Sequence, residues 1–124
     1  MKYSGILLFG HFVIWAFCLM GNSQSSETLK TDINQLFHDI NFNLSQIKTL
    51  PDYGNDPNYQ RCRELVVNAQ VAFLYDNNIC VIKCLDNIEY LLPKLNPTTE
   101  TEKYLKKTWD NLGKLYKVYD QYWT

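Results

Sequence analysis

The sequence has few of the residues from which enzyme active sites and metal centres are usually built. Its 124 residues include two histidines, and one of them, His11, lies in an apolar N-terminal stretch. The five glycines are scattered, so no glycine-rich loop for binding phosphate follows a strand. Internal repeats and low-complexity tracts are also absent. A phosphate-binding loop and a repeat architecture are therefore not expected.

Catalysis has few side chains to depend on. A serine or cysteine nucleophile with a histidine base would have to use His38, which falls on the polar side of its helical segment. We expect His38 to be a solvated surface residue. The closely spaced carboxylates Glu100 and Glu102 lie where a helix begins, so capping accounts for them. We therefore expect no enzymatic activity and no cofactor.

The N-terminus has the composition of a secretory leader. Lys2 precedes a 15-residue apolar run that begins at Ile6, and small or polar residues follow the run. This order is typical of a signal peptide, whereas a transmembrane anchor needs about 20 apolar residues. We expect residues 1–23 to be a signal peptide that is removed, and residues 24–124 to form one secreted, extracellular domain.

The expected mature chain is close to neutral. Loss of Lys2 leaves 11 basic residues against 13 acidic ones, a net charge of −2. This balance is too mild to indicate binding to nucleic acid or to a membrane surface. A chain of about 100 residues forms one domain that buries roughly 60–65% of its unfolded surface. We expect no nucleic-acid partner, and no membrane association after cleavage.

Four segments have apolar residues at the spacing of one helix face. The first has Leu29, Ile33, Leu36, Phe37, Ile40, Leu44 and Ile47, and the second has Cys62, Leu65, Val66, Ala69, Ala72 and Phe73; the third has Val81, Cys84, Leu85, Ile88, Leu91 and Leu92, and the fourth has Leu105, Trp109, Leu112, Tyr116, Tyr119 and Trp123. Four amphipathic helices with short links predict an all-α four-helix bundle, with no sheet beyond a short strand pair in the links.

Local signals separate the segments. Ser25 or Ser26 can cap the first helix, and Asp56-Pro57 is a good cap and first turn for the second. Asn77-Asn78 indicates a turn before the third helix. Thr99-x-x-Glu102 matches a capping box that opens the last helix.

The second segment is apolar on more than one side. Val67, Val71 and Leu74 lie away from its main apolar face, so we expect this helix to be buried over much of its circumference. Its β-branched residues also leave a strand open as an alternative.

Three cysteines, Cys62, Cys80 and Cys84, remain after the leader. In the secretory pathway this odd count predicts one disulfide and one spare thiol. Cys80 and Cys84 are one turn apart on one helix face and point in parallel directions, which favours a bridge from Cys62 to one of them. A tight hairpin at Asn77-Asn78 would place Cys62 about 23 Å and Cys84 about 10 Å from the turn, too unequal for a bridge. A free Cys62 and a disulfide-linked dimer therefore stay open.

No metal site is expected, because the cysteines and His38 lack the close spacing of zinc ligands. Two surface features remain. Phe42 projects away from the apolar face of the first segment, beside Asp39, and either covers a loop or contacts another protein. Asn43-Leu44-Ser45 is an N-glycosylation sequon on the same segment, so a glycoprotein is expected.

The phrases "RCRELVVNAQVAFLYDNN", "IEYLLPKLNP" and "TEKYLKKTWDNLGKLYKVYDQYW" resemble helices of short-chain four-helix-bundle cytokines of the interleukin-3 and interleukin-4/interleukin-13 groups. The likeness spans residues 29–123. It implies a secreted signal that binds cell-surface receptor chains through the outer faces of its first and last helices. On these faces Asp39 and Phe42 lie together, and Lys107 and Lys114 share one side.

The resemblance and the link lengths predict different helix orders. The cytokine group has up-up-down-down order, which needs two long crossovers. The links "PDYGNDP" and "PKLNPT" reach only about 25 and 20 Å when extended, which favours up-down-up-down order. An alternative function is a secreted helical carrier or effector that binds a small apolar ligand or a host protein. In that case the second helix and some of the nine tyrosines would line an internal pocket.

Overall fold

A computed structural model describes residues 25–50 and 56–123; the expected signal peptide lies outside the described residues. The described chain forms α2 (Ser26–Gln46), α3 (Pro57–Leu74), α4 (Asn78–Leu91), the short 3-10 helix η1 (Leu92–Lys94) and α5 (Glu102–Trp123). The predicted all-α class is confirmed. The second segment is helical, so the alternative of a strand is wrong.

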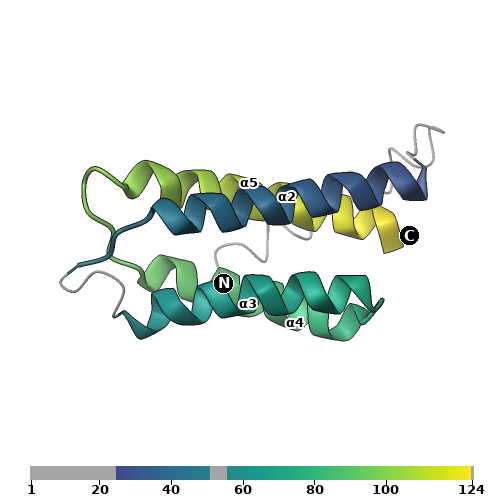
Figure 1. Cartoon of the computed structure of the whole chain (residues 1–124), viewed down its shortest axis with the longest axis horizontal. Coiled ribbons are helices and arrows are strands. Elements are labelled where there is room, and N and C mark those ends of the chain that lie inside the picture. Colours follow the sequence, from purple (N-terminus) through teal and green to yellow (C-terminus); the bar gives the residue numbers. More distant parts are fainter. Residues whose placement is uncertain (1–24, 51–55, 124) are drawn as a thin grey trace.

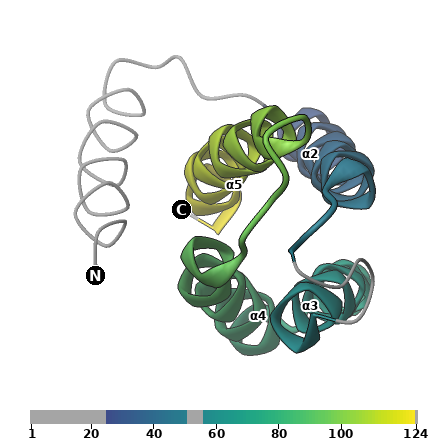
Figure 2. The same cartoon turned by 90° about the vertical axis from the view of Figure 1, so that its left-hand side faces the viewer.

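The four long helices pack as two antiparallel pairs. Helices α2 and α5 lie side by side, and α3 and α4 form the second pair (Figures 1 and 2). Each helix runs opposite to the one before it, and the α2–α3 and α4–α5 links lie at the same end of the bundle (Figure 1). The order is therefore up-down-up-down, as the short links predict. The up-up-down-down order implied by the cytokine resemblance is not observed.

The two links at this end are hydrogen-bonded to each other. The Leu50 N–H donates to the Asn96 carbonyl and the Thr98 N–H donates to the Lys48 carbonyl, each at 2.8 Å. These bonds flank an antiparallel bridge between Thr49 and Pro97. Within the described residues, strand pairing is confined to the links, as expected.

Side-chain caps begin three of the helices. The Ser25 hydroxyl accepts from the Thr28 N–H, Asp56 accepts from the first N–H groups of α3, and Asn77 accepts from the Cys80 N–H. The last helix begins at Glu102, later than the predicted capping box places it. Its preceding turn is organised by Thr101, whose hydroxyl accepts from the Lys48 N–H at 3.1 Å. The contact between Thr101 and the α2–α3 link therefore takes the place of the predicted Thr99-x-x-Glu102 capping box.

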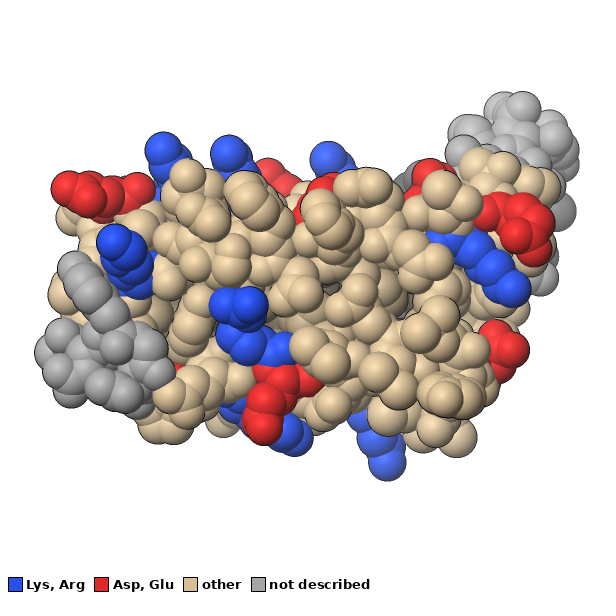
Figure 3. Space-filling view, in the orientation of Figure 1, with Lys and Arg blue, Asp and Glu red and all other residues tan. Residues whose placement is uncertain are grey.

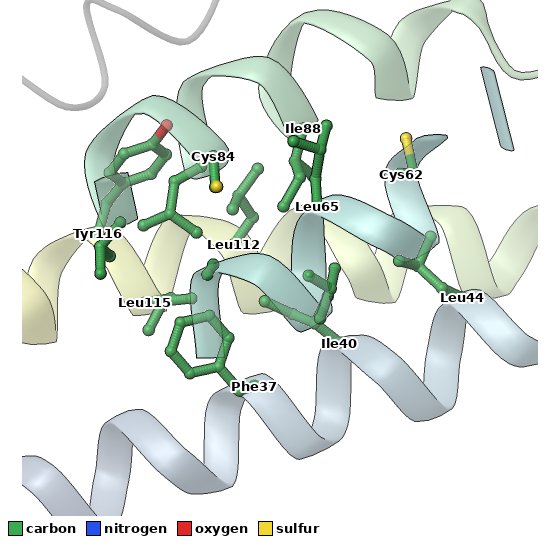
Figure 4. Packing of buried hydrophobic residues seen from close by; sticks show 14 of the residues in the cluster. Phe37, Ile40, Leu44, Cys62, Leu65, Cys84, Ile88, Leu112, Leu115 and Tyr116 are labelled. Carbon is green, nitrogen blue, oxygen red and sulfur yellow. The ribbon is translucent and has the colours of Figure 1, made fainter. Parts of the chain in front are cut away.

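The core lies between the two helix pairs and contains apolar residues of all four helices. Phe37 and Leu44 of α2 and Leu115 of α5 lie on one side of it, and Leu65 of α3 packs toward them from the other pair (Figure 4). At one end, the Tyr119 hydroxyl donates to Asn78 Oδ1 at 2.8 Å and joins the last helix to the start of α4.

Helix α3 is not buried over much of its circumference, which corrects the expectation from its second apolar set. Val67, Val71 and Leu74 are 49%, 47% and 71% exposed. In a bundle of two helix pairs each helix has an outer face, and these three residues lie on that of α3. They are therefore surface residues.

Candidate protein-binding site

A shallow hollow of about 310 Å³ lies between α2 and α5. Its lining residues are Asp39, Phe42 and Asn43 of α2 and Lys107, Asp110, Asn111 and Lys114 of α5. All four residues predicted to bind a receptor are in this set. They come together because up-down-up-down order makes the first and last helices neighbours.

Phe42 is the apolar part of the hollow. Its side chain is 56% exposed, while Phe37, Ile40 and Leu44 of the same helix are buried. The described residues that share the hollow with Phe42 belong to α2 and α5 and to no link. Of its two expected roles, this position favours a contact for another protein over covering a loop. An exposed aromatic ring within a polar rim is the arrangement found at the centre of many protein interfaces.

Both signs of charge surround Phe42. Asp39 accepts a hydrogen bond from Gln35 Nε2 at 2.9 Å, and its carboxylate lies 3.6 Å from His38 Nδ1. Lys107 Nζ lies 5.4 Å from the centroid of the Tyr104 ring. Gln35 therefore holds Asp39 in place, and the Tyr104 ring helps to position Lys107.

Sequence reasoning missed Asp110 and Asn111, although a signal for them was present. They lie three and four positions after Lys107 on α5, and therefore on the same helix face. The exposed lysines Lys103, Lys106 and Lys117 extend the positive surface of this helix beyond the hollow. His38 faces solvent, with 74% of its side chain exposed, as predicted.

Asn43, the predicted glycosylation site, also lines the hollow. It is 7% exposed within α2, and the Ser45 hydroxyl of its sequon donates to the Phe42 carbonyl. A glycan must leave from an amide that faces solvent, so Asn43 would need modification before α2 packs. Glycosylation stays a prediction, and a glycan would compete with a protein partner for the hollow.

The three candidate cysteines have free thiols. Burial raises the pKa of Cys62 to about 12, with a smaller effect from the Asp56 carboxylate. Burial and the neighbouring Cys80 thiol raise the pKa of Cys84 to about 11. The Cys62 and Cys84 sulfur atoms point into separate parts of the core (Figure 4). This fold therefore gives no support to a Cys62–Cys84 bridge, and both thiols are poor nucleophiles at neutral pH.

A buried carboxyl group outside the hollow was not identified from the sequence. Glu89 of α4 is 4% exposed, and burial followed by the nearby Asp86 carboxylate raises its pKa. The Tyr116 hydroxyl of α5 donates its one proton to Asp86 Oδ1 at 2.7 Å, and the nearness of this hydroxyl to Glu89 partly offsets the rise in the pKa of Glu89. Glu89 therefore links pH to the stability of the bundle.

Glu89→Gln is expected to make the fold more stable at neutral pH. Since the pKa of Glu89 is higher in the folded chain, the folded state binds its proton more tightly than the unfolded state. The free energy of unfolding should then fall as the pH rises from the ordinary carboxyl pKa through the raised value. Melting temperatures measured from about pH 3 to about pH 8 test this, because the interval spans the pH range in which carboxyl groups titrate.

The variant and the natural chain should have similar melting temperatures at the acid end and diverge as the pH rises. The exposed Glu64→Gln is the matched control. Parallel curves for Glu89→Gln and the natural chain would show that Glu89 is not the linked group.

Comparisons with protein-family models, with curated proteins and with solved structures found no match to this chain. The fold itself gives the class: a small all-helical protein of four helices packed as a bundle. None of the helices in the described ranges is both long enough and apolar enough to cross a membrane. Within the same ranges, no group of three His, Cys, Asp or Glu side chains is placed to hold a metal ion.

Proposed function

We propose that this protein is a secreted, cytokine-like signal that binds a cell-surface receptor through the hollow between α2 and α5. The observation that carries the proposal is the position of Phe42. It is a half-exposed aromatic side chain in a hollow that two helices form, and charged residues of both helices surround it. Such a ring can be desolvated by a partner, while the charges around it guide the approach.

The composition of the hollow supports recognition of a protein. It presents carboxylates, amines, amides and one phenyl ring. Helices hold the backbone positions of these residues on a rigid surface, so little backbone order has to be gained when a partner binds. The shallow shape also suits a protein surface better than a small molecule, which usually needs a deeper site.

The proposal does not require the helix order of the interleukin groups. The up-down-up-down order of this bundle differs from the order that the resemblance implies (Figure 1). The proposal rests on the surface that α2 and α5 form together.

The carrier alternative has lost its main support. It required the second apolar face of α3 to line an internal pocket, and Val67, Val71 and Leu74 of that face lie on the surface. The receptor proposal is therefore the one that the geometry favours.

Charge reversal of both hollow lysines, Lys107→Glu with Lys114→Glu, tests the proposal. At low salt the double variant should associate with receptor-bearing cells about tenfold more slowly than the natural chain. The difference between the two rates should shrink as salt is added, because salt screens the charges. The measurement is the binding rate of fluorescently labelled mature protein to a panel of intact cells, with displacement by unlabelled protein.

The matched control is Lys30→Glu with Lys94→Glu, which makes the same change in net charge at sites of α2 and η1 that line neither the hollow nor any other described pocket. This control should change the rate much less. Equal slowing by both pairs would indicate a general effect of charge, and unsaturable binding by the natural chain would contradict the receptor proposal.

A further inference from the structure

The outer face of α3 carries a row of exposed apolar side chains, here called the α3 ridge: Val67, Val71 and Leu74. No charged residue occurs in the sequence from 65 to 75. The space-filling view shows a correspondingly uncharged area over the second half of α3 (Figure 3). The ridge is therefore apolar surface that no residue in the described ranges covers.

An open groove of about 620 Å³ lies beside the ridge, between α3 and α4. Its lining includes Leu65 and Ala72 of α3, Tyr75 directly after α3, and Cys80 of α4. Val71 belongs to both features, since it forms one wall of the groove and the middle of the ridge. A convex and a concave surface thus adjoin on the same helix pair.

A carboxylate lies beside the ridge, whereas the charged residues that line the groove are cationic. The charged residues that line the groove are Arg61 and Lys83, both cationic. Glu64 precedes Val67 by one helical turn, so its carboxylate lies at the end of the ridge. Its side chain is 65% exposed. Within one chain Glu64 is 3.2 Å from Arg61 Nη1, so the acidic and basic parts of this surface are adjacent.

We infer that the protein forms a two-fold homodimer in which the α3 ridge of each copy packs into the α3–α4 groove of the other. A two-fold interface uses the same patch on both copies, so that patch must be complementary to itself. A ridge that adjoins a groove meets this requirement. The two-fold rotation that places the ridge of one copy in the groove of the second also places the ridge of the second copy in the groove of the first. The Glu64 carboxylate beside each ridge then approaches the groove of the other copy, whose charged lining residues are cationic.

This dimer is separate from the proposed receptor site, which lies on the other helix pair. Leu74→Glu is the test variant, because Leu74 belongs to the ridge, does not line the groove and is 71% exposed. Sedimentation velocity of the mature chain over a wide concentration range gives the dimer dissociation constant. We expect dimers for the natural chain and a constant raised about 30-fold or more by Leu74→Glu.

Phe42→Ala, at the hollow, is the control and should leave the dimer unchanged. A second readout is alkylation of Cys80, which is half-buried in the groove and should become protected as the concentration rises. Chains that stay monomeric throughout, or dimers that Leu74→Glu does not weaken, would overturn the inference. So would a monomer that binds an apolar dye in the groove, since the groove would then hold a small ligand.

Discussion

Phe37→Ala is expected to lower the free energy of unfolding by about 3–5 kcal/mol, the range for removing a fully buried phenylalanine. Phe37 has no exposed surface, and its ring centroid lies 6.3 Å from that of Phe73 on α3. Phe73 in turn contacts the Tyr119 ring of α5 at 6.0 Å. The substitution would leave a cavity where three helices meet, in a domain whose total stability is about 5–15 kcal/mol.

Urea unfolding followed by helical circular dichroism measures the effect of Phe37→Ala. Phe42→Ala is the matched control, since it removes the same side chain from the exposed side of the same helix. Its effect on stability should stay within about 0.5 kcal/mol. Similar losses for the two variants would mean that the packing around Phe37 is not as described.

Phe42→Ala is expected to weaken receptor binding by about 1–3 kcal/mol, which is roughly 5- to 150-fold in the dissociation constant. The physical reason is that a partner gains most from desolvating the one large apolar group in the hollow, while the charged rim contributes mainly to the rate of association. Titration of labelled protein on receptor-bearing cells measures the change.

Tyr90→Ala is the matched control for binding, because Tyr90 is an aromatic residue of α4 with a similar exposed fraction, 52%. It should leave the dissociation constant unchanged. A lower melting temperature for Phe42→Ala with unchanged binding would mean that Phe42 has a structural role and that the hollow is not the receptor site.

Much of the fold could be predicted from the sequence, because helical periodicity and link length are local properties. The apolar spacing located all four helices, and the short reach of the links favoured the up-down-up-down order over the order that the cytokine resemblance implies. The residue at which the last helix begins could not be predicted. It depends on a hydrogen bond between two links that are far apart in the sequence, in which the Lys48 N–H donates to the Thr101 hydroxyl. The exposure of Val67 and Leu74 likewise depends on which helices pack beside α3, which periodicity does not report.

The candidate site was predictable one helix at a time. The spacing of Asp39 and Phe42, and that of Lys107 and Lys114, placed each pair on one face of its helix. Their meeting in one hollow depends on the packing of α2 against α5, which is a property of the bundle. The sequon gave no indication that Asn43 is buried, because burial is set by the same packing.

Photocrosslinking from position 42 is the direct test of whether Phe42 contacts a cell-surface receptor. A benzoyl-substituted phenylalanine replaces Phe42 in one sample and Tyr90 in another, and each labelled protein is irradiated while bound to cells. If the hollow binds the receptor, position 42 gives a covalent adduct with one membrane protein that is lost when excess natural protein competes, and position 90 gives no such adduct. An adduct from position 90 alone, or specific binding without any adduct from position 42, would contradict the receptor proposal.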